Sequence, residues 1–176
     1  MLGCVRLRHA TPEDLPFLLE LEVRFCNLGF VGRDDAVVHE RQMADADFVY
    51  YMVEQKGVRA GYVILRGLTS INRCLELKRI VMAEPGHGLG RQVLRALMDK
   101  SFGELSAHRL WLDVYDDNNR ARHVYRSLGF IEEGTLRECI NRDGSYGSLV
   151  VMAMLESEYR AIIVGQDGSR STSPEF

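Results

Sequence analysis

The first part of the chain passes from a strand-like to a helix-like pattern of apolar residues. Apolar and polar residues alternate over residues 4–10, which predicts a strand. Over residues 11–25 apolar residues recur every three or four positions, so a helix is expected, with Thr11 as its N-cap and Pro12 in its first turn. A second helix is expected over residues 34–46. The predicted buried face of the first helix consists of Leu15, Leu18, Leu21 and Phe25.

The rest of the chain is dominated by strand-like runs. Residues 47–68 contain two such runs joined by a Gln-Lys-Gly turn, which predicts an antiparallel hairpin, and residues 73–82 predict another strand. An amphipathic helix is expected from Leu89 to Phe102, where apolar residues recur at helical spacing. The remaining expected elements are a strand at 108–115, a short helix within 116–130 that ends at Gly129, and strands at 130–140 and 148–155 around a turn at 141–147.

Length and composition are those of one globular domain. The chain has 176 residues, of which 46% are hydrophobic and 27% charged, and it contains no internal repeat. From Val164 onward the sequence is small, polar and aperiodic. We therefore expect one domain over residues 1–163 and a disordered tail over residues 164–176.

Charge and cysteine usage exclude several classes of protein. The net charge of −3 argues against general binding of nucleic acid or of anionic membranes. Signal-peptide and membrane-spanning patterns are both absent from the sequence, so a cytoplasmic protein is expected. The cysteines are scattered without the spacing of a zinc site or a disulfide framework, and they are Cys4, Cys26, Cys74 and Cys139.

A glycine-rich turn joins the strand at 73–82 to the helix that follows it. Its glycines are Gly86, Gly88 and Gly90. A dinucleotide-binding motif would need a further glycine where Arg91 stands, and a P-loop would need Lys-Ser or Lys-Thr after Gly90. Two interpretations remain open: the backbone amides at the start of the helix bind a pyrophosphate, or the glycines only form a tight turn with positive φ angles.

A second motif lies about 30 residues further along the chain. Residues 110–130 place Asn118 at the start of a helix, Tyr125 seven residues later, and a Gly-Phe pair at its end. Together with the glycine-rich turn, this motif resembles the GNAT superfamily of acyl-CoA N-acyltransferases. The segments LKRIVM, NRARHVYRSLGFIEEGTLRE and RDGSYGSLVVMAML are most similar to the branch that contains ribosomal-protein-alanine and spermidine acetyltransferases. The turn departs from the family pattern, because Pro85 stands where Gln or Arg is usual and the loop is shorter.

The resemblance implies a fold and an activity. The fold would be a single α/β (α+β) domain whose mixed, mostly antiparallel sheet has seven strands and is flanked by four helices. The activity would be transfer of an acetyl group from acetyl-CoA to a primary amine, without a metal. The acceptor stays open between a protein N-terminus, a polyamine and another small amine, and a homodimer is compatible with the family. The alternative is a domain that binds CoA or acyl-CoA as a sensor without catalysis.

The resemblance also implies which residues meet acetyl-CoA. The backbone of residues 80–82 would pair with the pantetheine arm as an added strand does. Asn118 would reach the same arm, and a plain N-cap is an equally natural role for it. Residues 87–91 would bind the pyrophosphate through their amides, with the charge of Arg91 nearby. The cofactor residues expected on this basis are Ile80, Val81, Met82, His87, Gly88, Leu89, Gly90, Arg91 and Asn118.

Three residues are candidates for the chemistry. Tyr125 matches the family tyrosine near the thioester sulfur, where its hydroxyl would protonate the leaving thiolate, although its apolar neighbours also suit a packed core tyrosine. The attacking amine must lose a proton, and Glu76 and Asp113 on the central strands are the candidate bases. We rank Glu76 slightly first, because its strand borders both substrates in the resembled fold. Structural interpretations exist for both: Glu76 as an exposed strand residue near Lys78, and Asp113 as a buried, paired carboxylate.

Overall fold

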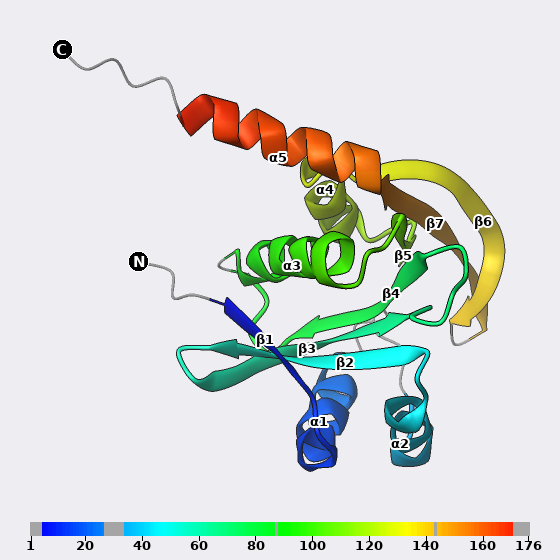
Figure 1. The fold of residues 1–176 in the computed structure, drawn as a ribbon. Coiled ribbons are helices and arrows are strands. Elements are labelled where there is room, and N and C mark those ends of the chain that lie inside the picture. The colour runs from blue at the N-terminus through cyan, green and yellow to red at the C-terminus, as the bar shows by residue number, and fades with distance from the viewer. Residues whose placement is uncertain (1–4, 27–33, 87, 143, 171–176) are drawn as a thin grey trace.

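The protein is built around one seven-stranded sheet, as a computed structural model shows (Figure 1). The structure describes residues 5–26, 34–86, 88–142 and 144–170. The strand order is β1-β2-β3-β4-β5-β7-β6, and every neighbouring pair is antiparallel except β4 with β5. The strands are β1 Val5–His9, β2 Phe48–Gln55, β3 Val58–Arg66, β4 Cys74–Met82, β5 Arg109–Tyr115, β6 Ile131–Arg142 and β7 Ser145–Leu155.

Helices cover both faces of the sheet. In Figure 1, α1 and α2 lie on one face, whereas α3, α4 and α5 lie on the other. A 3-10 turn at Pro12–Asp14 precedes α1, and a π turn at Lys100–Glu104 continues α3. The helices are α1 Leu15–Cys26, α2 Ala36–Ala44, α3 Leu89–Asp99, α4 Asn119–Ser127 and α5 Glu156–Arg170.

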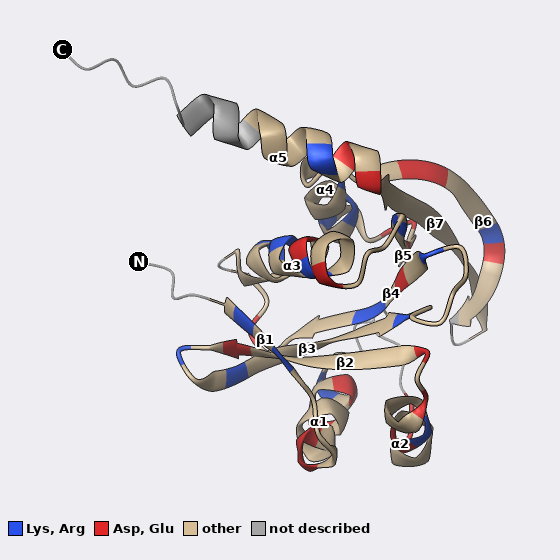
Figure 2. Cartoon of the chain, in the orientation of Figure 1, with Lys and Arg blue, Asp and Glu red and all other residues tan. Residues whose placement is uncertain are grey.

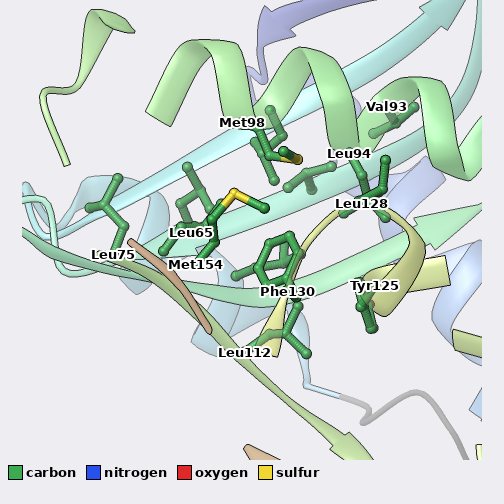
Figure 3. Close-up of a cluster of buried hydrophobic side chains, with 14 of the residues drawn as sticks. Leu65, Leu75, Val93, Leu94, Met98, Leu112, Tyr125, Leu128, Phe130 and Met154 are labelled. Atoms are coloured by element: carbon green, nitrogen blue, oxygen red, sulfur yellow. The ribbon is translucent and has the colours of Figure 1, made fainter. Parts of the chain in front are cut away.

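Each face of the sheet has its own apolar core. The larger core packs α3 and α4 against the sheet, and Figure 3 shows its members Leu94, Leu112 and Phe130 together with Tyr125. The smaller core packs α1 against β2, β3 and β4. Its helical members are the predicted Leu18, Leu21 and Phe25. Burial of these side chains is the main force that holds the helices in place.

The centre of the sheet opens after a short parallel contact. The register joins β4 to β5 only from Cys74–Glu76 to Arg109–Trp111. The neighbouring pairing of β3 with β4 passes from Leu65↔Leu77 to Ile64↔Arg79, so Lys78 is the extra residue of a β-bulge. Beyond this point the second half of β4 faces β5 without pairing to it.

The predicted fold class and strand positions are confirmed, and the helix count is five in the described residues rather than four. The pattern missed α5, which occupies residues 156–170, so the described part of the expected tail from Val164 to Arg170 is helical. Among the described residues, no helix combines the length and the apolar character needed to cross a membrane.

Candidate active site

A cavity of about 660 Å³ lies between the end of β4, the glycine-rich turn and the starts of α3 and α4. Two arginines line it, Arg91 from α3 and Arg120 from α4, and its described lining contains no carboxylate. This charge suits a ligand that carries phosphate groups. The predicted cofactor residues in its wall are Ile80, Val81, Met82, Gly88, Gly90, Arg91 and Asn118.

The glycine-rich turn is shaped by its backbone. Gly86 has a φ of 120° and Gly88, the N-cap of α3, has a φ of 74°, so both occupy conformations that disfavour other residues. A Cβ built on Gly88 would meet no atom within 4 Å, which leaves space beside the first turn of α3. The first amides of a helix have no partner within it and attract anions. The interpretation as a turn with positive φ is confirmed, and the turn also borders the cavity, so binding of a pyrophosphate stays a prediction.

Other predicted cofactor residues surround the same turn. Arg91 donates to the Oγ of Ser127 and so connects α3 to α4 across the cavity. Leu89 is buried in the larger core, so only its backbone remains for a ligand. His87 lies outside the described residues.

The end of β4 offers unpaired backbone to the cavity. Residues 80–82 pair with β3 on one side, whereas the pairing of β4 with β5 stops at Glu76. An extended ligand arm can therefore occupy the place of a neighbouring strand.

Asn118 has the capping role that its sequence position suggested. Its Oδ1 accepts a hydrogen bond from the backbone nitrogen of Ala121 at 3.1 Å, which caps α4. The same side chain lines the cavity of about 660 Å³ and also a second cavity next to it. Because the cap uses the oxygen, the amide nitrogen remains as a donor.

The second cavity has a volume of about 340 Å³ and lies where β4 and β5 separate. Four residues belong to the walls of both cavities: Ile80, Asn118, Ala121 and Tyr125. The two cavities are therefore adjacent and share this part of their walls.

Tyr125 stands at the border between this site and the core (Figure 3). Its ring is 8% exposed and packs against Phe130 with ring centroids 5.8 Å apart. Its hydroxyl has no hydrogen bond to any described residue. Burial, followed by the nearby charge of Asp113, raises the pKa of Tyr125 to about 12, so the hydroxyl keeps its proton at neutral pH.

Asp113 is the candidate base that shares a cavity with Tyr125. Its carboxylate forms no ion pair with any described residue. The residue is exposed, so the alternative of a buried, paired carboxylate is wrong. Partial loss of surrounding water still raises the pKa of Asp113, and the charges of Arg66 and Lys78 oppose that rise.

Glu76, the base ranked first from the sequence, does not line the cavity of Asp113 and Tyr125. It pairs with Arg66 of β3 and lines a separate hollow of about 350 Å³ together with Trp111. Burial raises the pKa of Glu76, an effect that Arg66 opposes. The structure thus brings Asp113 and Tyr125 together and leaves Glu76 outside their cavity.

A buried polar cluster beside the site was not predicted. Charged residues are absent from the middle of β2 and β3 but present within β4 (Figure 2). In β4, Arg79 pairs with Glu22 of α1 and with Asp34. Glu22 is fully buried and also accepts from the hydroxyl of Tyr62 at 2.7 Å, and His39 Nε2 lies 3.2 Å from its Oε1. Burial alone would raise the pKa of Glu22, but these donors lower it to about 2. The available signal was Glu22 itself, an acid on the apolar face of a predicted helix.

Within the described part of the chain, no three His, Cys, Asp or Glu side chains converge in a metal-binding arrangement. The two adjacent cavities instead combine a phosphate-compatible turn, a free strand edge, an acid and a protonated tyrosine. Such a site can bind an extended phosphate-bearing substrate and move a proton to or from a second one.

Comparisons with known proteins show the family to which the chain belongs. The model of the acetyltransferase (GNAT) family matches residues 15–130. The spermidine N(1)-acetyltransferase of Escherichia coli K12 is 29% identical over 167 residues, which cover 89% of each chain. The N-alpha-acetyltransferase RimI of Mycobacterium tuberculosis is 29% identical over 149 residues, covering 80% of this chain and 87% of the relative.

A solved structure shows the same architecture. The spermidine N-acetyltransferase from Vibrio cholerae, in complex with CoA and spermine, has a TM-score of 0.80 at 26% identity, covering 89% of this chain and 98% of that one. The sequence match to the family model and the shared fold lead to one conclusion: the chain belongs to the GNAT family and is an acetyl-CoA-dependent N-acetyltransferase.

Proposed function

We propose that acetyl-CoA occupies the cavity of about 660 Å³ and that a small primary amine enters the cavity of about 340 Å³. The observation that carries the proposal is the wall common to both cavities, which contains Tyr125 and Asn118. Across that wall an amine would approach a thioester held on the other side, which is the proximity that direct transfer requires.

The cosubstrate would be held mainly by backbone. The pyrophosphate would accept hydrogen bonds from amides of residues 88–91, with Arg91 and Arg120 nearby as positive charges. The pantetheine arm would pair with residues 80–82, and the free amide nitrogen of Asn118 would donate to it. Since these contacts use backbone, we expect them to form although Pro85 stands where the family pattern has Gln or Arg.

Asp113 and Tyr125 would carry the proton transfers. A primary amine arrives mostly as an ammonium ion at neutral pH, and Asp113 would accept the proton that it must lose. The amine nitrogen then forms a bond to the acetyl carbon, and the bond from that carbon to sulfur breaks. The hydroxyl of Tyr125 would donate its proton to the departing thiolate, so that CoA leaves as a thiol, and the second proton, which the amine nitrogen loses as the amide forms, would restore this hydroxyl.

The catalytic proposal is tested with acetyl-CoA and a panel of amines. The panel contains n-butylamine, spermidine and a short peptide with a free N-terminus, because relatives are named for spermidine and for N-alpha acetylation. Release of free thiol and the mass of the acetylated product are measured for the wild type and for Asp113→Asn. We expect product from at least one amine and a large loss in the variant. Binding of acetyl-CoA without any product would favour the sensor function instead.

A further inference from the structure

Charged side chains in and beside the cavity of about 340 Å³, here called the acceptor cavity, are almost fully paired. Lys78 and Arg79 both line this cavity, and both contact Asp34, at 3.4 Å and 3.2 Å respectively. Arg79 also pairs with the buried Glu22. Arg79 therefore has two carboxylate partners, whereas Lys78 has only Asp34, which it shares with Arg79, so its charge is only partly compensated. Asp113 is the carboxylate that remains unpaired in the described cavity wall.

The bulge in β4 places Lys78 at this position. Bulges change the direction of a side chain, and the extra residue here is a lysine beside the opening between β4 and β5. Its side chain is 20% exposed. Lys78 lies close enough to Asp113 for its charge to oppose the rise in the pKa of that carboxyl that partial loss of surrounding water causes, so its field reaches the point where the amine would react.

An acceptor with several ammonium groups brings more positive charges than this cavity has unpaired carboxylates. One ammonium can neutralise Asp113, but a second finds no other unpaired carboxylate in the described wall and lies near Lys78. Glu76 is already paired with Arg66. Residues 27–33, outside the described part of the chain, contain one arginine and no Asp or Glu, so they add no carboxylate.

We propose that Lys78 determines acceptor specificity, selecting an amine with a single ammonium group and a neutral or anionic tail over a polyamine. The inference rests on the proposed function, because it assigns a substrate class to the cavity of Asp113 and Tyr125. It also separates this chain from its spermidine-acetylating relatives, for which the acceptor is a polycation.

Three acceptors of equal chain length test the proposal. They are n-butylamine with a neutral tail, 4-aminobutanoate with an anionic tail and 1,4-diaminobutane with a cationic tail. We measure kcat/KM for each at one pH and ionic strength. The diamine is expected to be the poorest acceptor, by about tenfold relative to butylamine, since like charges in a partly screened cavity change binding by roughly that factor.

Two substitutions of Lys78 isolate its charge. Lys78→Met removes the charge and keeps the length, and Lys78→Glu reverses it. The ratio of diamine to aminobutanoate activity should rise in the order wild type, Lys78→Met, Lys78→Glu, by about tenfold per step. Lys56→Glu is the matched control, because Lys56 is an exposed residue of the β2–β3 turn, away from both substrate cavities, and the net charge changes equally.

Melting temperature and acetyl-CoA affinity are measured on each variant to confirm a folded protein. The proposal is overturned if the wild type prefers 1,4-diaminobutane or spermidine to butylamine. An unchanged acceptor ratio in folded Lys78→Met would also overturn it. These results leave the acetyltransferase function intact. Failure to acetylate any of the amines, in contrast, would remove the proposed function and this inference together.

Discussion

Replacement of Tyr125 by phenylalanine separates a catalytic hydroxyl from a structural one. The substitution removes one oxygen and keeps the ring that packs against Phe130. Because no described residue hydrogen bonds to this hydroxyl, its loss breaks no bond within the described structure. We therefore expect the free energy of unfolding to change by less than about 1 kcal/mol, the usual contribution of one hydrogen bond.

The same substitution should reduce turnover. General acid catalysis typically contributes about 10²- to 10⁴-fold, and a thiolate is a fair leaving group, so we expect kcat to fall by about ten- to a hundredfold. Affinity for acetyl-CoA should hardly change, since protonation of the sulfur matters only as charge develops in the transition state. Turnover is followed by thiol release, affinity by calorimetry and stability by urea unfolding, all on one preparation.

Tyr62→Phe is the matched control. The hydroxyl of Tyr62 donates to the buried Glu22 at 2.7 Å, so this variant should lose about 1–2 kcal/mol of stability and retain its turnover per folded molecule. The two tyrosines thus have opposite expected profiles. Full turnover in Tyr125→Phe together with a lowered stability would refute the assignment of Tyr125 as the proton donor.

Three further substitutions test the site and the cluster beside it. Asp113→Asn should reduce kcat/KM by about a hundredfold and remove the acidic limb of the pH profile of kcat/KM, whereas Glu76→Gln should leave that limb in place. Loss of the limb in Glu76→Gln and not in Asp113→Asn would return the role of base to Glu76. Gly88→Val should weaken acetyl-CoA binding. Gly57→Val is its control, because Gly57 has a similar φ of 78° and equally open surroundings, so this variant should lose similar stability without a change in binding. Equal affinities of the two variants for acetyl-CoA would contradict a phosphate site at the turn. Because the pKa of Glu22 falls from 4.5 to about 2 on folding, its ionised form stabilises the protein above about pH 4.5, and this contribution should disappear as the pH falls towards 2; urea unfolding of Glu22→Gln should lack this part of the pH dependence.

Local periodicity predicted most elements of the fold because each strand or helix buries one face. The stripe of Leu18, Leu21 and Phe25 and the cap by Asn118 are local features, and both agree with the structure. The helix α5 was missed, because none of its residues with a described burial is fully buried and the apolar Val164 is exposed. Periodicity carries little information about a helix that contributes so little to the core.

The chemistry of the site depended on contacts that local sequence does not contain. Glu76 and Asp113 are both acids on central strands, and only the register that pairs Arg66 with Glu76 distinguishes them. The bulge at Lys78 is equally non-local, because a single extra residue alters the direction of every side chain after it. The pairing of Glu22 with Arg79 joins residues 57 positions apart in the chain.

The early end of the pairing between β4 and β5 gives the sheet an edge in its interior. Edges of sheets normally lie at the periphery, where their free amides and carbonyls invite other proteins to add a strand and aggregate. Here the free edge of residues 80–82 borders a cavity that residues of α3 and α4 also line, so it lies within the sheet and not at its outer side. In the proposed binding mode, the slender arm of pantetheine pairs with this edge. The fold thus places the hydrogen-bonding groups of a strand edge inside the sheet, next to a cavity, and not at its periphery.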